Sequence, residues 1–190
     1  MRTVLKTMQK RKNNWIPKEK LDIFENVIDT YFVPGRGSNE GDNEFMKEIG
    51  EQFTQEQRFR IWEEHGGCTG SGHNKARKAF AIEYTGKPLA EKVKPYLEAF
   101  EEKYGKTLGV DLNEKNKTIT YKFACDECYK HSLGGKMKAP FELYYERCAL
   151  GRMENLQTAL GIKLIIKSVD IPSGGVSKES PCVFTFDIVE

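Results

Sequence analysis

The spacing of apolar residues changes near residue 107, and this change limits the chain to a mixed fold. Before that point apolar side chains recur every three to four residues, which is typical of amphipathic helices. The pattern predicts helices over about 17–33, 42–53, 55–65, 73–80 and 88–104. Thr54 and Gln57 have the spacing of a capping box, which predicts where the third helix begins.

After residue 107 apolar and polar residues alternate, as they do in half-buried strands. The alternation predicts strands over 108–112, 119–123, 162–171 and 182–189. A helix over 148–160, closed by Gly161, separates the two pairs of strands. We therefore predict an α+β fold in which N-terminal helices pack with a C-terminal antiparallel sheet domain.

The predicted division is a helical N-terminal region over 1–105 and an α+β domain over 106–190, packed as one unit. Residues 1–16 form a basic arm in this division. A length of 190 residues permits one or two units, and 38% hydrophobic residues suffice for a core. The net charge of +2, with acids and bases interspersed, argues against nucleic acid as a partner.

The first residues lack the apolar run of a signal peptide, and no stretch approaches the ~20 apolar residues that span a membrane. We therefore expect a cytoplasmic protein. The chain has five cysteines, an odd count, and a reducing compartment would keep them as thiols or metal ligands.

Cys125 and Cys128 form a C-x-x-C pair directly after a predicted strand, a spacing that lets two sulfurs chelate one ion. His131 follows three residues later, and Cys148 could complete a tetrahedral site for zinc, or for iron. Two alternatives remain open. The thiols are reduced and half-buried, or they exchange in a redox reaction, which the neighbouring acidic residues disfavour.

Cys68 lies in a glycine-rich stretch just before a predicted helix, whose N-terminal amides favour an anion, whether a thiolate or a bound carboxylate or phosphate. His73 or His65 could act as its base, which makes Cys68 and His73 candidate catalytic residues. The alternative is a simple turn between helices. The G-K-[ST] sequence of a phosphate loop is missing, so nucleotide binding is disfavoured.

The C-terminal third resembles the 4-vinyl reductase (V4R) domain over about 50 residues. The resemblance rests on the segment 145–153, the Leu160-Gly161 stop with its following strand, the Gly174-Gly175 turn and the final Cys182-x-Phe184 strand. Residues 65–190 also resemble a family of uncharacterised bacterial proteins with cysteines at similar places. The resemblance implies a small-molecule sensing or binding fold, related to haem NO-binding and vesicle-tethering domains, with an apolar cavity between helices and sheet.

Such a cavity would be lined by aromatic residues of the sheet domain, with an arginine to meet an acidic group on the ligand. The candidate ligand-binding residues are Tyr121, Phe123, Tyr144, Tyr145, Arg147, Arg152, Phe184 and Phe186. We expect a domain, not primarily an enzyme, that binds a small apolar or amphipathic molecule. The alternatives are a thiol-dependent hydrolase or reductase that uses Cys68 or Cys148 with a histidine, and a protein-interaction module. A homodimer is one assembly left open.

Overall fold

The computed structural model describes Met8 and residues 15–31, 39–65, 73–100, 107–125, 141–173 and 176–189. Within these ranges the fold is α+β, with helices and a four-stranded antiparallel sheet, as predicted. The chain divides into two compact units. Unit 1 holds the helices of the first third and the first turn of α7, and unit 2 holds α5, α6, the sheet and the rest of α7.

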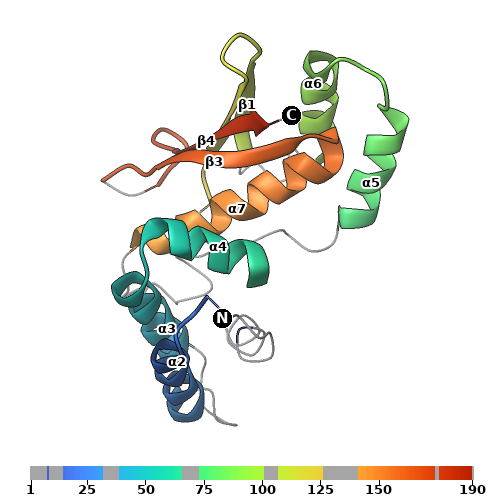
Figure 1. Cartoon of the computed structure of the whole chain (residues 1–190). Coiled ribbons are helices and arrows are strands. Elements are labelled where there is room, and N and C mark those ends of the chain that lie inside the picture. Colours follow the sequence, from blue (N-terminus) through green and yellow to red (C-terminus); the bar gives the residue numbers. More distant parts are fainter. Residues whose placement is uncertain are drawn as a thin grey trace. The chain divides into compact units, whose positions relative to one another are not determined.

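Unit 1 is built from α2 (Lys18–Tyr31), α3 (Asn39–Gln52) and α4 (Gln55–His65), coloured blue to teal in Figure 1. Its core is aromatic: the Phe24 ring centroid lies 5.4 Å from that of Phe45 and 5.9 Å from that of Phe53, and Phe45 lies 6.2 Å from Trp62. These are distances at which aromatic pairs attract each other. The apolar spacing of α2 and α3 therefore predicted the core of unit 1 correctly.

The capping box at the start of α4 is confirmed. The Gln57 backbone N–H donates to Thr54 Oγ1 at 3.4 Å, and the Thr54 N–H donates to Gln57 Oε1 at 3.1 Å. These two bonds satisfy backbone donors that a helix start leaves without intrahelical partners.

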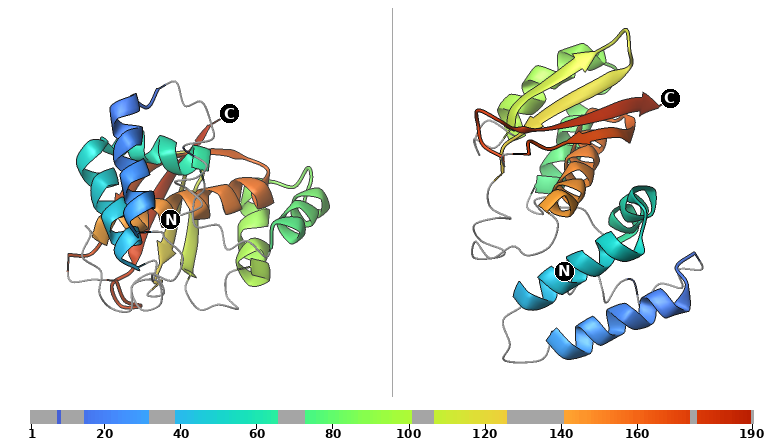
Figure 2. Two further views of the ribbon diagram at one scale, coloured as in Figure 1. Left: turned by 90° about the horizontal axis from the view of Figure 1, so that it is seen from below. Right: turned by 90° about the vertical axis from the view of Figure 1, so that its left-hand side faces the viewer.

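Unit 2 contains the sheet, whose strands are β1 (Thr107–Asn113), β2 (Thr118–Phe123), β3 (Lys163–Asp170) and β4 (Cys182–Val189). Their order is β1-β2-β4-β3 and every neighbouring pair is antiparallel, so two hairpins join through β2 and β4. Figures 1 and 2 show α7 (Phe141–Leu160) lying across one face of this sheet. The inner face is apolar because alternate residues of β2 and β4 point to it.

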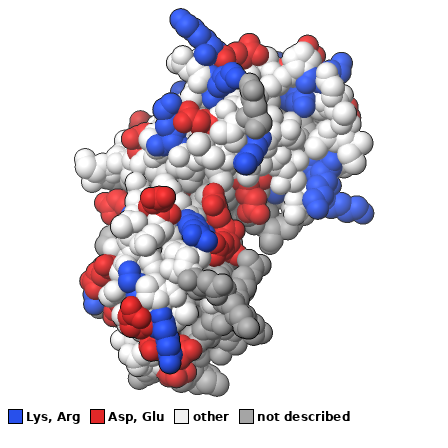
Figure 3. Space-filling model, in the orientation of Figure 1, with Lys and Arg blue, Asp and Glu red and all other residues white. Residues whose placement is uncertain are grey.

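The other face of the sheet is polar and carries ion pairs between neighbouring strands. Lys122 Nζ lies 3.0 Å from Asp111 Oδ2, and Lys167 Nζ lies 3.0 Å from Asp187 Oδ1. Lysine or arginine and acidic side chains are also interspersed on the face of the chain drawn in Figure 3. A sheet with one apolar and one polar face needs a helix layer on one side only, which α7 supplies.

Helices α5 (Asn74–Glu83) and α6 (Leu89–Phe100) also belong to unit 2. They pack through Phe80, whose ring centroid lies 6.4 Å from that of Tyr96 and 5.6 Å from that of Phe100. α6 is anchored to α7 because Lys92 Nζ donates to the Leu160 carbonyl oxygen at 3.2 Å. A lysine in this position satisfies one of the free carbonyls at the end of a helix.

The predicted stop of α7 is confirmed at Gly161, which has φ +68° and donates its N–H to the Gln157 carbonyl at 3.0 Å. Glycine suits this left-handed position because it has no Cβ. The start of α7 differs from the prediction, since the helix begins at Phe141 and not near Cys148. A second difference is Leu108, which is 40% exposed because a register shift between Thr107 and Gly109 interrupts the alternation of β1.

Candidate functional site

Four aromatic residues of β2 and β4, all candidate ligand-binding residues, form a continuous layer on the inner face of the sheet. Tyr121 lies opposite Phe184 in the register, and their ring centroids are 6.4 Å apart. Phe123 contacts both of them, with centroid distances of 6.0 Å to each. Tyr121, Phe184 and Phe186 are fully buried, and Phe123 is nearly so. The register of β2 on β4 therefore brings together side chains some 60 residues apart in the sequence.

Arg152 of α7 places a positive charge on this aromatic layer. Its guanidinium carbon lies 5.2 Å from the centroid of the Phe123 ring, and the residue is half-buried. A guanidinium is weakly hydrated and stacks well on aromatic faces, which explains how a cation is tolerated here. The arrangement joins an apolar wall to a group that can donate several hydrogen bonds to a carboxylate or phosphate.

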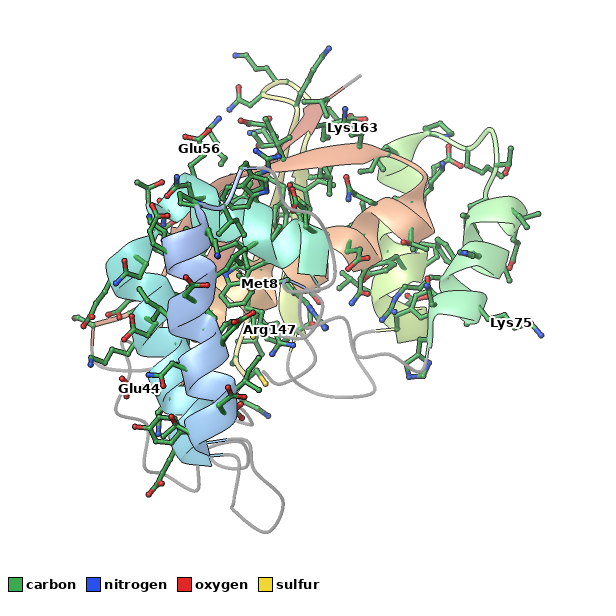
Figure 4. The ribbon with its side chains drawn as sticks, turned by 60° about the horizontal axis from the view of Figure 1, so that its bottom comes forward. Met8, Glu44, Glu56, Lys75, Arg147 and Lys163 are labelled. Atoms are coloured by element: carbon green, nitrogen blue, oxygen red, sulfur yellow. The ribbon has the colours of Figure 1, made fainter. Side chains whose placement is uncertain are left out.

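The other predicted arginine, Arg147, lies five residues earlier on α7, which is about 140° around the helix from Arg152. Arg147 is half-buried and labelled in Figure 4. The two arginines therefore project from different sides of α7. Tyr144 belongs to unit 1, where its hydroxyl donates to Asn43 Oδ1 of α3 at 3.5 Å.

Tyr145 connects α7 to the end of β2. Its hydroxyl donates to the backbone carbonyl oxygen of Cys125 at 3.1 Å, and the bond is buried. This carbonyl follows the last residue of β2 by two positions, so the hydrogen bond satisfies an acceptor just beyond the strand. Tyr145 thus holds the segment that carries Cys125 against the helix that carries Cys148.

Cys125, Cys148 and Cys182 are buried cysteines of unit 2. Cys182 lies opposite Phe123 in the β2–β4 register, and Cys125 follows Phe123 by two residues. Burial, together with the smaller effect of the nearby Cys125 thiol, raises the pKa of the Cys182 thiol from 9.0 to about 12. At neutral pH Cys182 is therefore a protonated, apolar part of the layer.

The predicted metal site is described only in part, since Cys128 and His131 lie outside the described residues. Within the ranges given above, no group of three or more histidine, cysteine, aspartate or glutamate residues is arranged to hold a metal ion. Cys125 and Cys148 on their own do not supply the four ligands of a tetrahedral site. The described donors therefore do not support zinc or iron, and the role of Cys128 and His131 stays a prediction.

The predicted catalytic pair is likewise incomplete. Cys68 lies outside the described residues, and His73 is the half-buried residue that precedes α5. The pairing of a Cys68 thiol with a His73 imidazole stays a prediction.

Sequence reasoning missed Arg77 of α5. This arginine is only 4% exposed, and its Nε atom is buried with no hydrogen-bond partner. A signal was present, because His73, Arg77, Phe80 and Tyr84 are spaced three or four residues apart and so share one face of a helix. Because two of these four residues are polar, the spacing of apolar residues did not show that this face of the helix is buried.

Comparison with known proteins finds no matching family model, no matching curated protein and no matching solved structure. The V4R resemblance therefore stays a prediction. In the part of the chain that the structure describes, no helix has both the length and the apolar character needed to cross a bilayer.

Proposed function

We propose that unit 2 binds a small, partly apolar molecule that carries an acidic group. The single observation that carries the proposal is the guanidinium of Arg152 at 5.2 Å from the Phe123 ring, at the edge of a buried aromatic layer. Binding sites for such ligands combine apolar walls with a few polar groups that fix orientation. In this proposal Phe123 contacts the apolar part of the ligand and Arg152 donates to its acidic group.

The resemblance to V4R domains supports the same kind of function, because it implies ligand binding between the helices and the sheet. The protonation state of Cys182 favours ligand binding over thiol chemistry at the aromatic layer. Its pKa of about 12 leaves very little thiolate at neutral pH, and the thiolate is the reactive form. The thiol is thus suited to line an apolar site.

The proposal is tested with two probes that share one chain length, decanoate and decanol. Binding of each to the full chain is measured by isothermal titration calorimetry at pH 7.5. Wild type should bind decanoate more tightly than decanol, because hydrogen bonds from a guanidinium to a carboxylate contribute about 1.5–3 kcal/mol, or roughly 10- to 100-fold in Kd.

Arg152→Met keeps most of the apolar stem and removes the charge, so it should erase the preference for decanoate and leave decanol binding almost unchanged. Lys163→Met removes the same charge from an exposed position at the start of β3 and serves as the control (Figure 4). Failure of wild type to bind either probe, or an unchanged preference in Arg152→Met, would contradict the proposal.

A further inference from the structure

The start of α5 has the wrong charges for an isolated helix. The first turn contains no acidic residue, and Lys75, Arg77 and Lys78 place three cations within the first five positions. The N-terminal end of a helix carries a partial positive charge, so cations there are unfavourable and anions are favourable. His73, which precedes the helix, makes no capping hydrogen bond with its side chain. This end of α5 therefore concentrates positive potential.

Arg77 adds an independent observation at the same end. Only 4% of the residue is exposed, and its Nε donor has no hydrogen-bond partner. Among the described residues its recorded interaction is with an aromatic ring: the guanidinium carbon lies 5.7 Å from the centroid of Phe100. A buried guanidinium ordinarily has a carboxylate or a set of carbonyl acceptors, because a charged donor without an acceptor is costly to bury.

The direction of the Arg77 side chain follows from helix geometry. Side chains on a helix lean toward its N-terminus, and Arg77 is the fourth residue of α5. By this rule the Arg77 side chain leans toward the first turn of α5, and its guanidinium lies beside Phe100, the last residue of α6. The backbone N–H groups of Asn74, Lys75 and Ala76 belong to this first turn, where an α-helix provides no intrahelical acceptor for them.

The buried Arg77 Nε–H has no acceptor, and the first-turn amides have none within the helix. The amides lie on exposed residues and the guanidinium is buried beside them, so a ligand could reach the amides from solvent and accept from Arg77 on its inner side. Figure 4 shows Lys75 pointing away from the rest of the chain, and basic side chains mark the region of α5 in Figure 3. Surface lysines of this kind attract an anion, while Arg77 supplies the directed contact.

We propose that the N-terminus of α5 and Arg77 form a binding site for a small oxyanion, either a phosphate or a carboxylate group. The first-turn amides and the guanidinium donate to its oxygens, and Phe100 holds the guanidinium in place. This site is separate from the one proposed at Arg152, and either proposal can fail without the other.

The test is a titration of the ¹⁵N-labelled full chain with sodium phosphate at constant ionic strength, followed by heteronuclear NMR. A parallel titration with sodium acetate distinguishes a phosphate site from a carboxylate site. We expect saturable shifts of the Asn74, Lys75 and Ala76 amides and of the Arg77 Nε–H resonance with at least one of the two anions. Constant ionic strength matters because general screening would otherwise shift many surface signals.

Arg77→Met should weaken anion binding at least about tenfold, since it removes a charged donor. Lys78→Met removes the same charge from the next, exposed residue of α5, and it should weaken binding less than about fivefold. Arg77→Lys keeps the charge without the planar fork and should fall between wild type and Arg77→Met.

Thermal unfolding without added anion separates this role from a structural one. Because Arg77 Nε has no acceptor, Arg77→Met should melt no lower than wild type, and only wild type should gain stability from the anion. Shifts that stay linear with both anions, or that are equal in wild type and Arg77→Met, would overturn the proposal. A large loss of stability in Arg77→Met, with no anion effect on wild type, would also overturn it.

Discussion

Burial should make the Cys182 thiol very slow to alkylate. Its pKa is about 12 in the folded chain, against 9.0 for an ordinary cysteine, a difference of about three pH units. At any pH below 9 the folded chain therefore carries about a thousandfold less Cys182 thiolate than the unfolded chain, and the thiolate is the form that iodoacetamide attacks. Cys182 is also fully buried, so restricted access can only add to this factor.

The assay compares folded and urea-unfolded protein at pH 8, with quenching at intervals, tryptic digestion and mass spectrometry. Trypsin cleaves after Lys178 and Arg147, so Cys182 and Cys148 appear on different peptides. Alkylation of Cys182 should be at least about a thousandfold slower in the folded protein. Rates within tenfold of the unfolded chain would refute the reasoning, because they would require an accessible thiol with a nearly ordinary pKa.

Two further substitutions test the hydrogen bond at Cys125 and the raised pKa of Cys182. Tyr145→Phe removes the hydroxyl that donates to the Cys125 carbonyl, and it should lower the free energy of unfolding by about 1–2 kcal/mol in urea denaturation followed by circular dichroism. Tyr84→Phe is the control, and equal stability of the two variants would contradict a contribution from this bond. Cys182→Ala tests pH dependence: between pH 9 and about 12 the folded chain keeps the Cys182 proton that the unfolded chain loses. Wild-type stability should therefore fall with rising pH, by about 1.4 kcal/mol per unit relative to Cys182→Ala, and parallel profiles would contradict the raised pKa.

The sheet could be predicted well from the sequence because its signals are local. β4 was predicted over 182–189, which are its observed bounds, since alternate positions from Cys182 to Phe186 are apolar. The pairing of β2 with β4 was not predicted, because the chain between them is long and register depends on contacts distant in sequence. Cys125 and Cys182 lie near each other because of that register, so the sequence alone did not predict their proximity.

Local patterns were less informative where a helix is buried on several sides. The first turns of α7 contain Leu143, Tyr144, Tyr145 and Glu146, which are all buried. A helix buried this widely has no clear polar face, so its periodicity weakens and its start was placed too late. Arg77 was missed for a related reason, because burial of a charged residue is rare and no hydropathy pattern predicts it.

The central claim is that a ligand lies against Phe123 and Arg152, and isotope-filtered nuclear Overhauser spectra of labelled protein with unlabelled decanoate test it most directly. We expect contacts between the methylene protons of decanoate and the ring protons of Phe123, with a saturable shift of the Arg152 Nε–H resonance. Saturable binding with contacts confined to other residues, or no saturable binding, would contradict the claim.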